Sequence, residues 1–200
     1  MNIDAVVSAI QKKLGVTEDG LAGPETWKAI YNTVVGAPVP TTKGFSDKVD
    51  VRSELVIATL LPEVKTYART LVQRAAAAGI EIKVIAGLRT YAEQDELFAQ
   101  GRAKPGKRVT NAKGGESNHN FGVAFDVGVF EGNAYLDDSP AYDAVGAIGA
   151  SIGLEWGGHW ISLVDKPHFQ LRPNWAKVMS ESEMLAELSK RLENKAAVYG

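Results

Sequence analysis

Two of the chain's three histidines lie in polar segments with carboxylates close by. His119 is followed by Gly122, which permits a sharp turn, and by Asp126, which projects from a segment whose opposite face is apolar. His168 begins another short segment, and Pro167 holds the residue before it in extended backbone. Two histidines and one aspartate leave the fourth position of a tetrahedral zinc ion open. The pattern is therefore compatible with a catalytic zinc site made by His119, Asp126 and His168.

A further carboxylate and a cation complete the predicted chemistry. Asp165 lies close to His168 in the sequence but off the segment that His168 begins. Such a carboxylate can take the proton of a water molecule acidified by zinc and pass it to a leaving amine. Arg89 is expected at the junction between a strand and a helix. Its guanidinium group can stabilise a carbonyl oxygen that becomes negative, or bind a substrate carboxylate. Two simpler interpretations stay open: a lone histidine is more often a core or surface residue, and Asp126 can merely end a strand.

The composition limits what else the chain can do. Its 200 residues include 22 Lys+Arg and 24 Asp+Glu, so no general basic field exists to hold nucleic acid or an anionic membrane. The absence of cysteine excludes disulfides, a thiolate nucleophile and metal sites built on sulfur. No apolar stretch is long enough to predict a membrane span. A metal site must therefore use histidine and carboxylate ligands.

Periodicity predicts the elements that position these residues. Apolar spacing indicates helices at 3–14, from Pro24 onward, over 53–78 with a break or restart at Pro62, from Thr90 to about Gly101, over 140–153 and from Ser180 onward. Alternation indicates strands at 80–86 and 123–129, and a short last strand at 168–171. The strand at 123–129 carries Asp126 on the face opposite its apolar residues. We therefore expect residues 1–37 to form a small helical module, 38–46 a linker and 47–200 the main domain.

Four segments of the main domain carry a more specific signal. They are GLRTYAEQ at 87–94, SNHNFGVAFD at 117–126, GGHW at 157–160 and DKPHFQ at 165–170. In this order they resemble the zinc peptidases that cut D-amino-acid bonds in bacterial peptidoglycan. These are the VanY/VanX-like D-Ala-D-Ala peptidases and the L-alanyl-D-glutamate endopeptidases of phage endolysins. The resemblance implies an α+β fold, with a small antiparallel sheet flanked by helices as in hedgehog and D-Ala-D-Ala peptidases, preceded by a small all-α module.

The resemblance also implies roles for individual residues. It implies zinc ligation by His119, Asp126 and His168, acid and base catalysis by Asp165, and transition-state stabilisation by Arg89. Gln94 and Ser117 fall on motif positions and are expected on the substrate side, although Ser117 can equally cap its loop. Trp156 and Trp160 either line the substrate groove or belong to the core. His159 stands where the family often has aspartate, and we interpret it as a cleft-side residue and not a ligand.

Residues 1–37 carry a second resemblance. The segment QKKLGV at 11–16, Asp19-Gly20 and the segment GPETWKAI at 23–30 are similar to a shortened peptidoglycan-binding domain of the three-helix type. This similarity implies binding to the cell wall. The alternative is that the module only packs as a helical cap.

The resemblance favours one function over two alternatives. It implies a zinc peptidase that hydrolyses stem peptides at the L-alanyl-D-glutamate bond and so degrades the cell wall. The alternatives are a D-alanyl-D-alanine carboxypeptidase and a non-catalytic wall-binding module. Because the N-terminus has no basic segment followed by an apolar run, we expect a phage endolysin that is made in the host cytoplasm, or else a secreted enzyme. Its expected partner is peptidoglycan, and the chain is expected to act as a monomer.

Overall fold

The computed structural model describes residues 3–20, 24–35, 48–161 and 164–199. Contacts divide the chain into two compact units, residues 1–46 and 47–200. The linker predicted at 38–46 lies outside the described residues. In the described part of the chain, no helix has the length and apolar character needed to cross a bilayer.

The first unit contains helix α1 (Ile3–Leu14) and helix α2 (Pro24–Val35). Gln11 of α1 is buried and joins the two: its Nε2 donates to Asp19 Oδ1 at 2.6 Å and to Thr26 Oγ1 at 2.9 Å. Its Oε1 accepts from the Gly20 backbone N–H at 2.9 Å. One amide therefore holds the turn after α1 against the first turn of α2, while Trp27 leaves 60% of its surface exposed.

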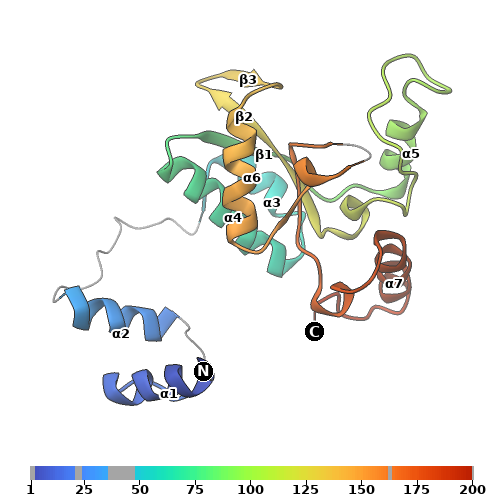
Figure 1. Cartoon of the computed structure of the whole chain (residues 1–200). Helices are drawn as coiled ribbons and strands as arrows, with labels where there is room; N and C mark the ends of the chain where they lie inside the picture. The colour runs from blue at the N-terminus through green and yellow to red at the C-terminus, as the bar shows by residue number, and fades with distance from the viewer. Residues whose placement is uncertain (1–2, 21–23, 36–47, 162–163, 200) are drawn as a thin grey trace. The chain divides into compact units, whose positions relative to one another are not determined.

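The second unit is built on a small antiparallel sheet (Figure 1). Its strands are β1 (Glu81–Ala86), β2 (Ala124–Glu131), β5 (His168–Gln170) and β4 (Glu155–Trp156), hydrogen-bonded in that order. Strand β3 (Ala134–Leu136) forms a hairpin with the end of β2. The α+β class with a small antiparallel sheet is therefore confirmed. The strand expected at 123–129 begins one residue later and runs two residues further.

Helices and single turns connect the strands. The α-helices are α3 (Val51–Ile57), α4 (Pro62–Ala77), α5 (Tyr91–Ala99), α6 (Ala141–Ser151) and α7 (Glu181–Glu193). The 3-10 turns are η1 (Asn118–Phe121), η2 (Gly157–His159) and η3 (Asn174–Ala176). Pro62 is the first residue of α4, where its missing N–H costs nothing, so the predicted helix 53–78 is two helices. Thr90 and Ser180 form the capping boxes that begin α5 and α7.

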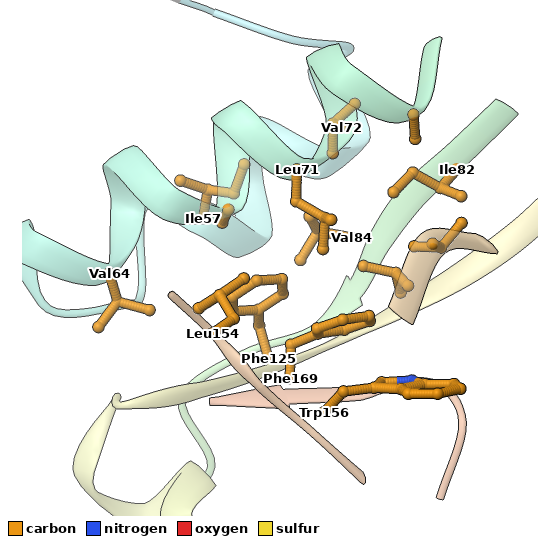
Figure 2. Close-up of a cluster of buried hydrophobic side chains, with 14 of the residues drawn as sticks. Ile57, Val64, Leu71, Val72, Ile82, Val84, Phe125, Leu154, Trp156 and Phe169 are labelled. Atoms are coloured by element: carbon orange, nitrogen blue, oxygen red, sulfur yellow. The ribbon is translucent and has the colours of Figure 1, made fainter. Parts of the chain in front are cut away.

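One face of the sheet carries the core. Phe125 and Phe169 lie directly opposite each other on β2 and β5, both are fully buried, and their rings stack at 5.9 Å. Figure 2 shows these rings beside Trp156 and below the apolar side chains of α3 and α4. Burial of each such ring stabilises the fold by about 1.5–3 kcal/mol. Because side chains alternate along a strand, the residues between these core positions point to the other face.

A second, smaller core packs helix α7 against η1. Met184 and Leu188 of α7 pack with Phe121 of η1 and with Val123 and Ala176. Trp175 Nε1 donates to the Val198 carbonyl at 2.8 Å, which ties the chain's last residues to η3. Helix α7 is thus anchored against the turn that carries His119.

Candidate metal centre and catalytic residues

Three side chains converge on the polar face of the sheet. His119 Nε2 and His168 Nδ1 each lie 3.2 Å from Asp126 Oδ1 and 3.3 Å from one another. Among the described residues, these three side chains form the group of histidine and carboxylate side chains that could hold a metal ion. His119 and His168 are buried, at 4% and 5% exposure. Figure 1 shows that the elements carrying them come from distant parts of the chain.

The chain positions His119 through a tight turn. Gly122 ends η1 with φ +67°, in the left-handed region that favours glycine, so the chain turns directly from η1 into β2. The ring of His119 is held by its other nitrogen, because Nδ1 lies 2.8 Å from the Gly87 carbonyl oxygen. A carbonyl can only accept, so Nδ1 carries the proton and Nε2 presents a lone pair to the cluster.

The sheet register positions the other two ligands. Asp126 of β2 and His168 of β5 are directly opposed in the antiparallel ladder. Opposed side chains lie on the same face and within contact distance. The Val127 backbone N–H also donates to the Pro167 carbonyl at 3.0 Å, which holds the approach to β5. A slip of one residue by either strand would turn that strand's ligand to the core face and separate it from the other.

The donor set fits a zinc ion. Tetrahedral zinc with ligands at about 2.0–2.1 Å separates neighbouring ligand atoms by about 3.3 Å. The triangle of 3.2, 3.2 and 3.3 Å has this size. Asp126 Oδ1 is buried and has no hydrogen-bond partner among the described residues. Three acceptor atoms this close repel one another unless a cation or a proton lies between them.

The electrostatics of the metal-free protein agree with this need for a cation. Burial opposes a charge on Asp126, but the two histidine rings beside it hold the pKa of this carboxyl far below its usual range. Burial likewise opposes a charge on His168, yet the Asp126 carboxylate beside it raises the pKa of the ring above its usual value. Both shifts favour a proton between Asp126 and His168 in the metal-free protein, and a metal ion that binds there displaces it.

Asp165 lies beside the cluster without joining it. Its backbone N–H donates to the Gly157 carbonyl at 3.0 Å, and its own carbonyl accepts from the His168 N–H at 3.2 Å. Burial, and then repulsion by Asp126, raises the pKa of the Asp165 carboxyl. Both histidines of the cluster and Arg89 pull that pKa in the opposite direction, as expected for a group close to them. A carboxylate with a raised pKa next to a metal cluster suits proton transfer.

Arg89 is held by the segment between β1 and α5. Its backbone N–H donates to the His119 carbonyl at 3.0 Å, and its own carbonyl accepts from Asn120 Nδ2 at 2.8 Å. Its Nη1 donates to Gln94 Oε1 at 2.8 Å. Gln94 is fully buried and donates from Nε2 to the Ala112 carbonyl at 2.8 Å. The structure thus places Gln94 as the residue that orients Arg89.

The remaining predicted site residues fall in different environments. Trp160 lies on the polar side, with its ring 4.8 Å from the ring of His168. Trp156 lies in the core at 8% exposure, and its Nε1 donates to the Lys166 carbonyl at 2.7 Å. His159 is exposed and its ring packs edge-on against Trp156 at 4.9 Å. Ser117 precedes η1, and its side chain does not cap the turn.

Sequence reasoning missed one group of polar residues behind His168. Gln170 is buried on the same face of β5, 3.0 Å from His168 Nε2, and it bonds to Glu155 of β4. Gln170 stands two residues after His168, so the strand period carried a signal for it. Glu155 carried none, because a two-residue strand has no detectable periodicity.

Comparisons with known proteins address the class of this site. A family model described as D-alanyl-D-alanine carboxypeptidase matches residues 110–171. The peptidoglycan L-alanyl-D-glutamate endopeptidase CwlK of Bacillus subtilis (strain 168) is 39% identical over an alignment of 129 residues, and the match covers 60% of this chain and 77% of that protein.

A solved structure supports the fold. The L-Ala D-Glu endopeptidase ChiX of Serratia marcescens matches with TM-score 0.50 and 25% identity, over 62% of this chain and 88% of that chain. A vancomycin-resistance D,D-pentapeptidase, VanY, solved with Zn(II), matches with TM-score 0.45 and 18% identity, over 66% of this chain and 83% of that chain.

Identity of this extent over most of the Bacillus protein places the chain among the metallopeptidases. It belongs to the M15 peptidase family. The family that the four segments of the main domain resemble is therefore confirmed.

Proposed function

We propose that this chain hydrolyses the L-alanyl-D-glutamate bond of peptidoglycan stem peptides, with zinc bound by His119, Asp126 and His168. The observation that carries the proposal is the nearly regular triangle of three ligand atoms with edges of 3.2–3.3 Å. Support for the scissile bond comes from CwlK and ChiX, both named as endopeptidases for this bond.

A bound zinc ion would supply a Lewis acid for the scissile carbonyl and lower the pKa of the attacking water. The chain's own residues then carry out the proton transfer and stabilise the developing negative charge. Asp165 accepts the proton of the attacking water at its carboxylate and returns it to the leaving amine. Arg89, held by Gln94, donates to the carbonyl oxygen as negative charge develops there. The ring of Trp160 beside His168 offers an apolar wall next to the reacting bond.

The test is digestion of purified murein, with the new termini identified by mass spectrometry. The proposal expects new N-terminal D-glutamate and free L-alanine carboxyl groups. The description of the matching family model supports a second candidate, D-alanyl-D-alanine carboxypeptidase activity. Release of free D-alanine alone would favour that candidate and overturn the endopeptidase proposal.

Two variants test the assigned roles. Asp165→Ala is expected to keep the fold and the bound zinc while turnover falls by about 10²–10⁴-fold, the usual contribution of a general base. His168→Ala is expected to lose the zinc, measured by metal analysis after dialysis. Full activity of the Asp165 variant would remove this residue from the mechanism. Such activity loss also separates an enzyme from a non-catalytic wall-binding module.

Two finer statements stay predictions. One is that the enzyme acts as a phage endolysin, and the other is that residues 1–37 bind the wall and do not only form a helical cap. The exposed Trp27 of α2 offers an aromatic surface for such binding.

A further inference from the structure

The side chain of Gln170 is held in one orientation by donors and acceptors of known character. Its Oε1 accepts from Asn118 Nδ2 at 2.7 Å and lies 3.0 Å from His168 Nε2. Its Nε2 donates to Glu155 Oε2 at 2.7 Å. A flipped amide would turn its NH₂ group toward the Asn118 donor and its oxygen toward a carboxylate. The amide is therefore locked with its oxygen facing His168.

This orientation decides which nitrogen of His168 carries the proton. Because Gln170 Oε1 can only accept, His168 Nε2 must be the N–H that donates to it. The opposite nitrogen, Nδ1, is then the one with a free lone pair when the ring is neutral. Nδ1 is the atom that lies 3.2 Å from Asp126 Oδ1, inside the ligand triangle. The amide thus selects the ring tautomer that can bind a metal ion.

The sheet register builds this arrangement. Gln170 lies opposite Ala124 of β2 on one side and opposite Glu155 of β4 on the other. Alanine leaves room for the amide, while the opposed glutamate lies within bonding distance of it.

Glu155 is fixed in turn from helix α7. Arg172 Nε donates to Glu155 Oε1 at 2.5 Å, and Arg172 Nη2 donates to Glu181 Oε2 at 2.6 Å. Glu181 is the first residue of α7 and also bonds through Oε1 to Asn118 Nδ2. Both oxygens of Glu155 are therefore used as acceptors, one for Gln170 and one for Arg172.

We propose that Gln170 and Glu155 act as positioning residues that hold His168 in its metal-binding tautomer. Arg172 and Glu181 anchor this pair to α7. The inference deepens the proposed function and rests on it, since it concerns the same metal centre. Partners of ligating histidines are typically worth about 10–100-fold in metal affinity or activity.

The test exchanges the two side chains. Glu155→Gln leaves only one acceptor oxygen for two donors, and Gln170→Glu sets two carboxylates against each other. The double variant Gln170→Glu/Glu155→Gln restores every bond. The carboxylate introduced at position 170 accepts from His168, from Asn118 and from the amide introduced at position 155, and the oxygen of that amide accepts from Arg172. Glu187→Gln, which breaks an i,i+4 pair with Arg191 on α7, is the matched control.

The readouts are the zinc Kd from chelator competition and the His168 Nε2–H signal in NMR spectra of the zinc-loaded protein. Each single variant is expected to raise the zinc Kd about 10–100-fold and to shift or lose the Nε2–H signal. The double variant is expected to recover both, and Glu187→Gln to change neither. A folded Glu155→Gln variant with wild-type zinc Kd and signal, or a double variant no better than the singles, would overturn the proposal. Neither readout uses substrate, so the result stands apart from any failure to cleave murein.

Discussion

Replacement of Gly157 by alanine probes how closely the chain packs Asp165 against the metal site. A Cβ at Gly157 would lie 2.5 Å from the Asp165 carbonyl oxygen and 3.0 Å from His168 Cβ, whereas ordinary contact begins at 3.4 Å. The nearest atom is backbone and cannot rotate away. Strand β5, which His168 begins, is paired with both β2 and β4, so the displacement of about 1 Å falls on Asp165.

A misplacement of about 1 Å costs about 10²-fold in rate, equivalent to about 2.7 kcal/mol of transition-state stabilisation. We therefore expect Gly157→Ala to lower kcat/KM about 100-fold on a stem-peptide substrate, with zinc still bound. The overpacked backbone is also expected to destabilise the fold by about 1–3 kcal/mol, measured by urea unfolding. Activity is therefore compared per folded molecule.

Two further variants make this prediction refutable. Gly132→Ala changes a hairpin glycine with φ +60° and open space around it, so it should cost about 1–2 kcal/mol in stability and nothing in kcat/KM. If Gly157→Ala acts by moving Asp165, it should have no further effect in the Asp165→Ala background. An unchanged kcat/KM for folded Gly157→Ala, or full additivity with Asp165→Ala, would refute the reasoning.

Two other perturbations give measurable results. Gln94→Met removes the acceptor of Arg89 Nη1 and leaves the half-buried Ala112 carbonyl without its donor. We expect about 1–3 kcal/mol lower stability in urea and at least about 10-fold lower kcat/KM, and wild-type kinetics would show that Arg89 does not depend on this bond. In chelator, the raised pKa of His168 stabilises the fold below its unfolded pKa of about 6.5, and this contribution is lost as pH rises through the raised value. The Tm of the metal-free protein should therefore fall from about pH 6 to about pH 9, while the increase in Tm conferred by zinc grows because protons no longer compete. A metal-free Tm that rises over this range would contradict the assignment.

The polar face of the sheet was accessible to sequence reasoning because it depends on local alternation. The period of two along 123–129 separates Asp126 from Phe125 and Val127, and the same period applies to His168 and Phe169. That Asp126 and His168 directly oppose each other is a matter of register between strands far apart in the chain. No local pattern encodes that register, so only the family resemblance predicted that Asp126 and His168 lie close together in space.

The elements that escaped prediction are those too short to show a period. Strand β4 has two residues and β3 has three, so neither displays an alternation. For the same reason the sequence did not decide whether Trp156 lines the groove or belongs to the core. Only its pairing with Phe169 places it on the core face. Glu155, its neighbour, necessarily points to the opposite face, where it meets Gln170.

The convergence of acceptors at the site links its chemistry to the stability of the fold. Nε2 of His119, Nδ1 of His168 and Oδ1 of Asp126 lie within 3.3 Å of one another, and each is presented by a separate structural constraint. These constraints are the Gly87 carbonyl, the Gln170 amide and the β2–β5 register. Since each constraint turns a lone pair inward, the folded chain without a cation must take up a proton to relieve the repulsion. Metal affinity, pH and folding stability are therefore coupled through the same three atoms, and a change in any of the three constraints should alter all of them together.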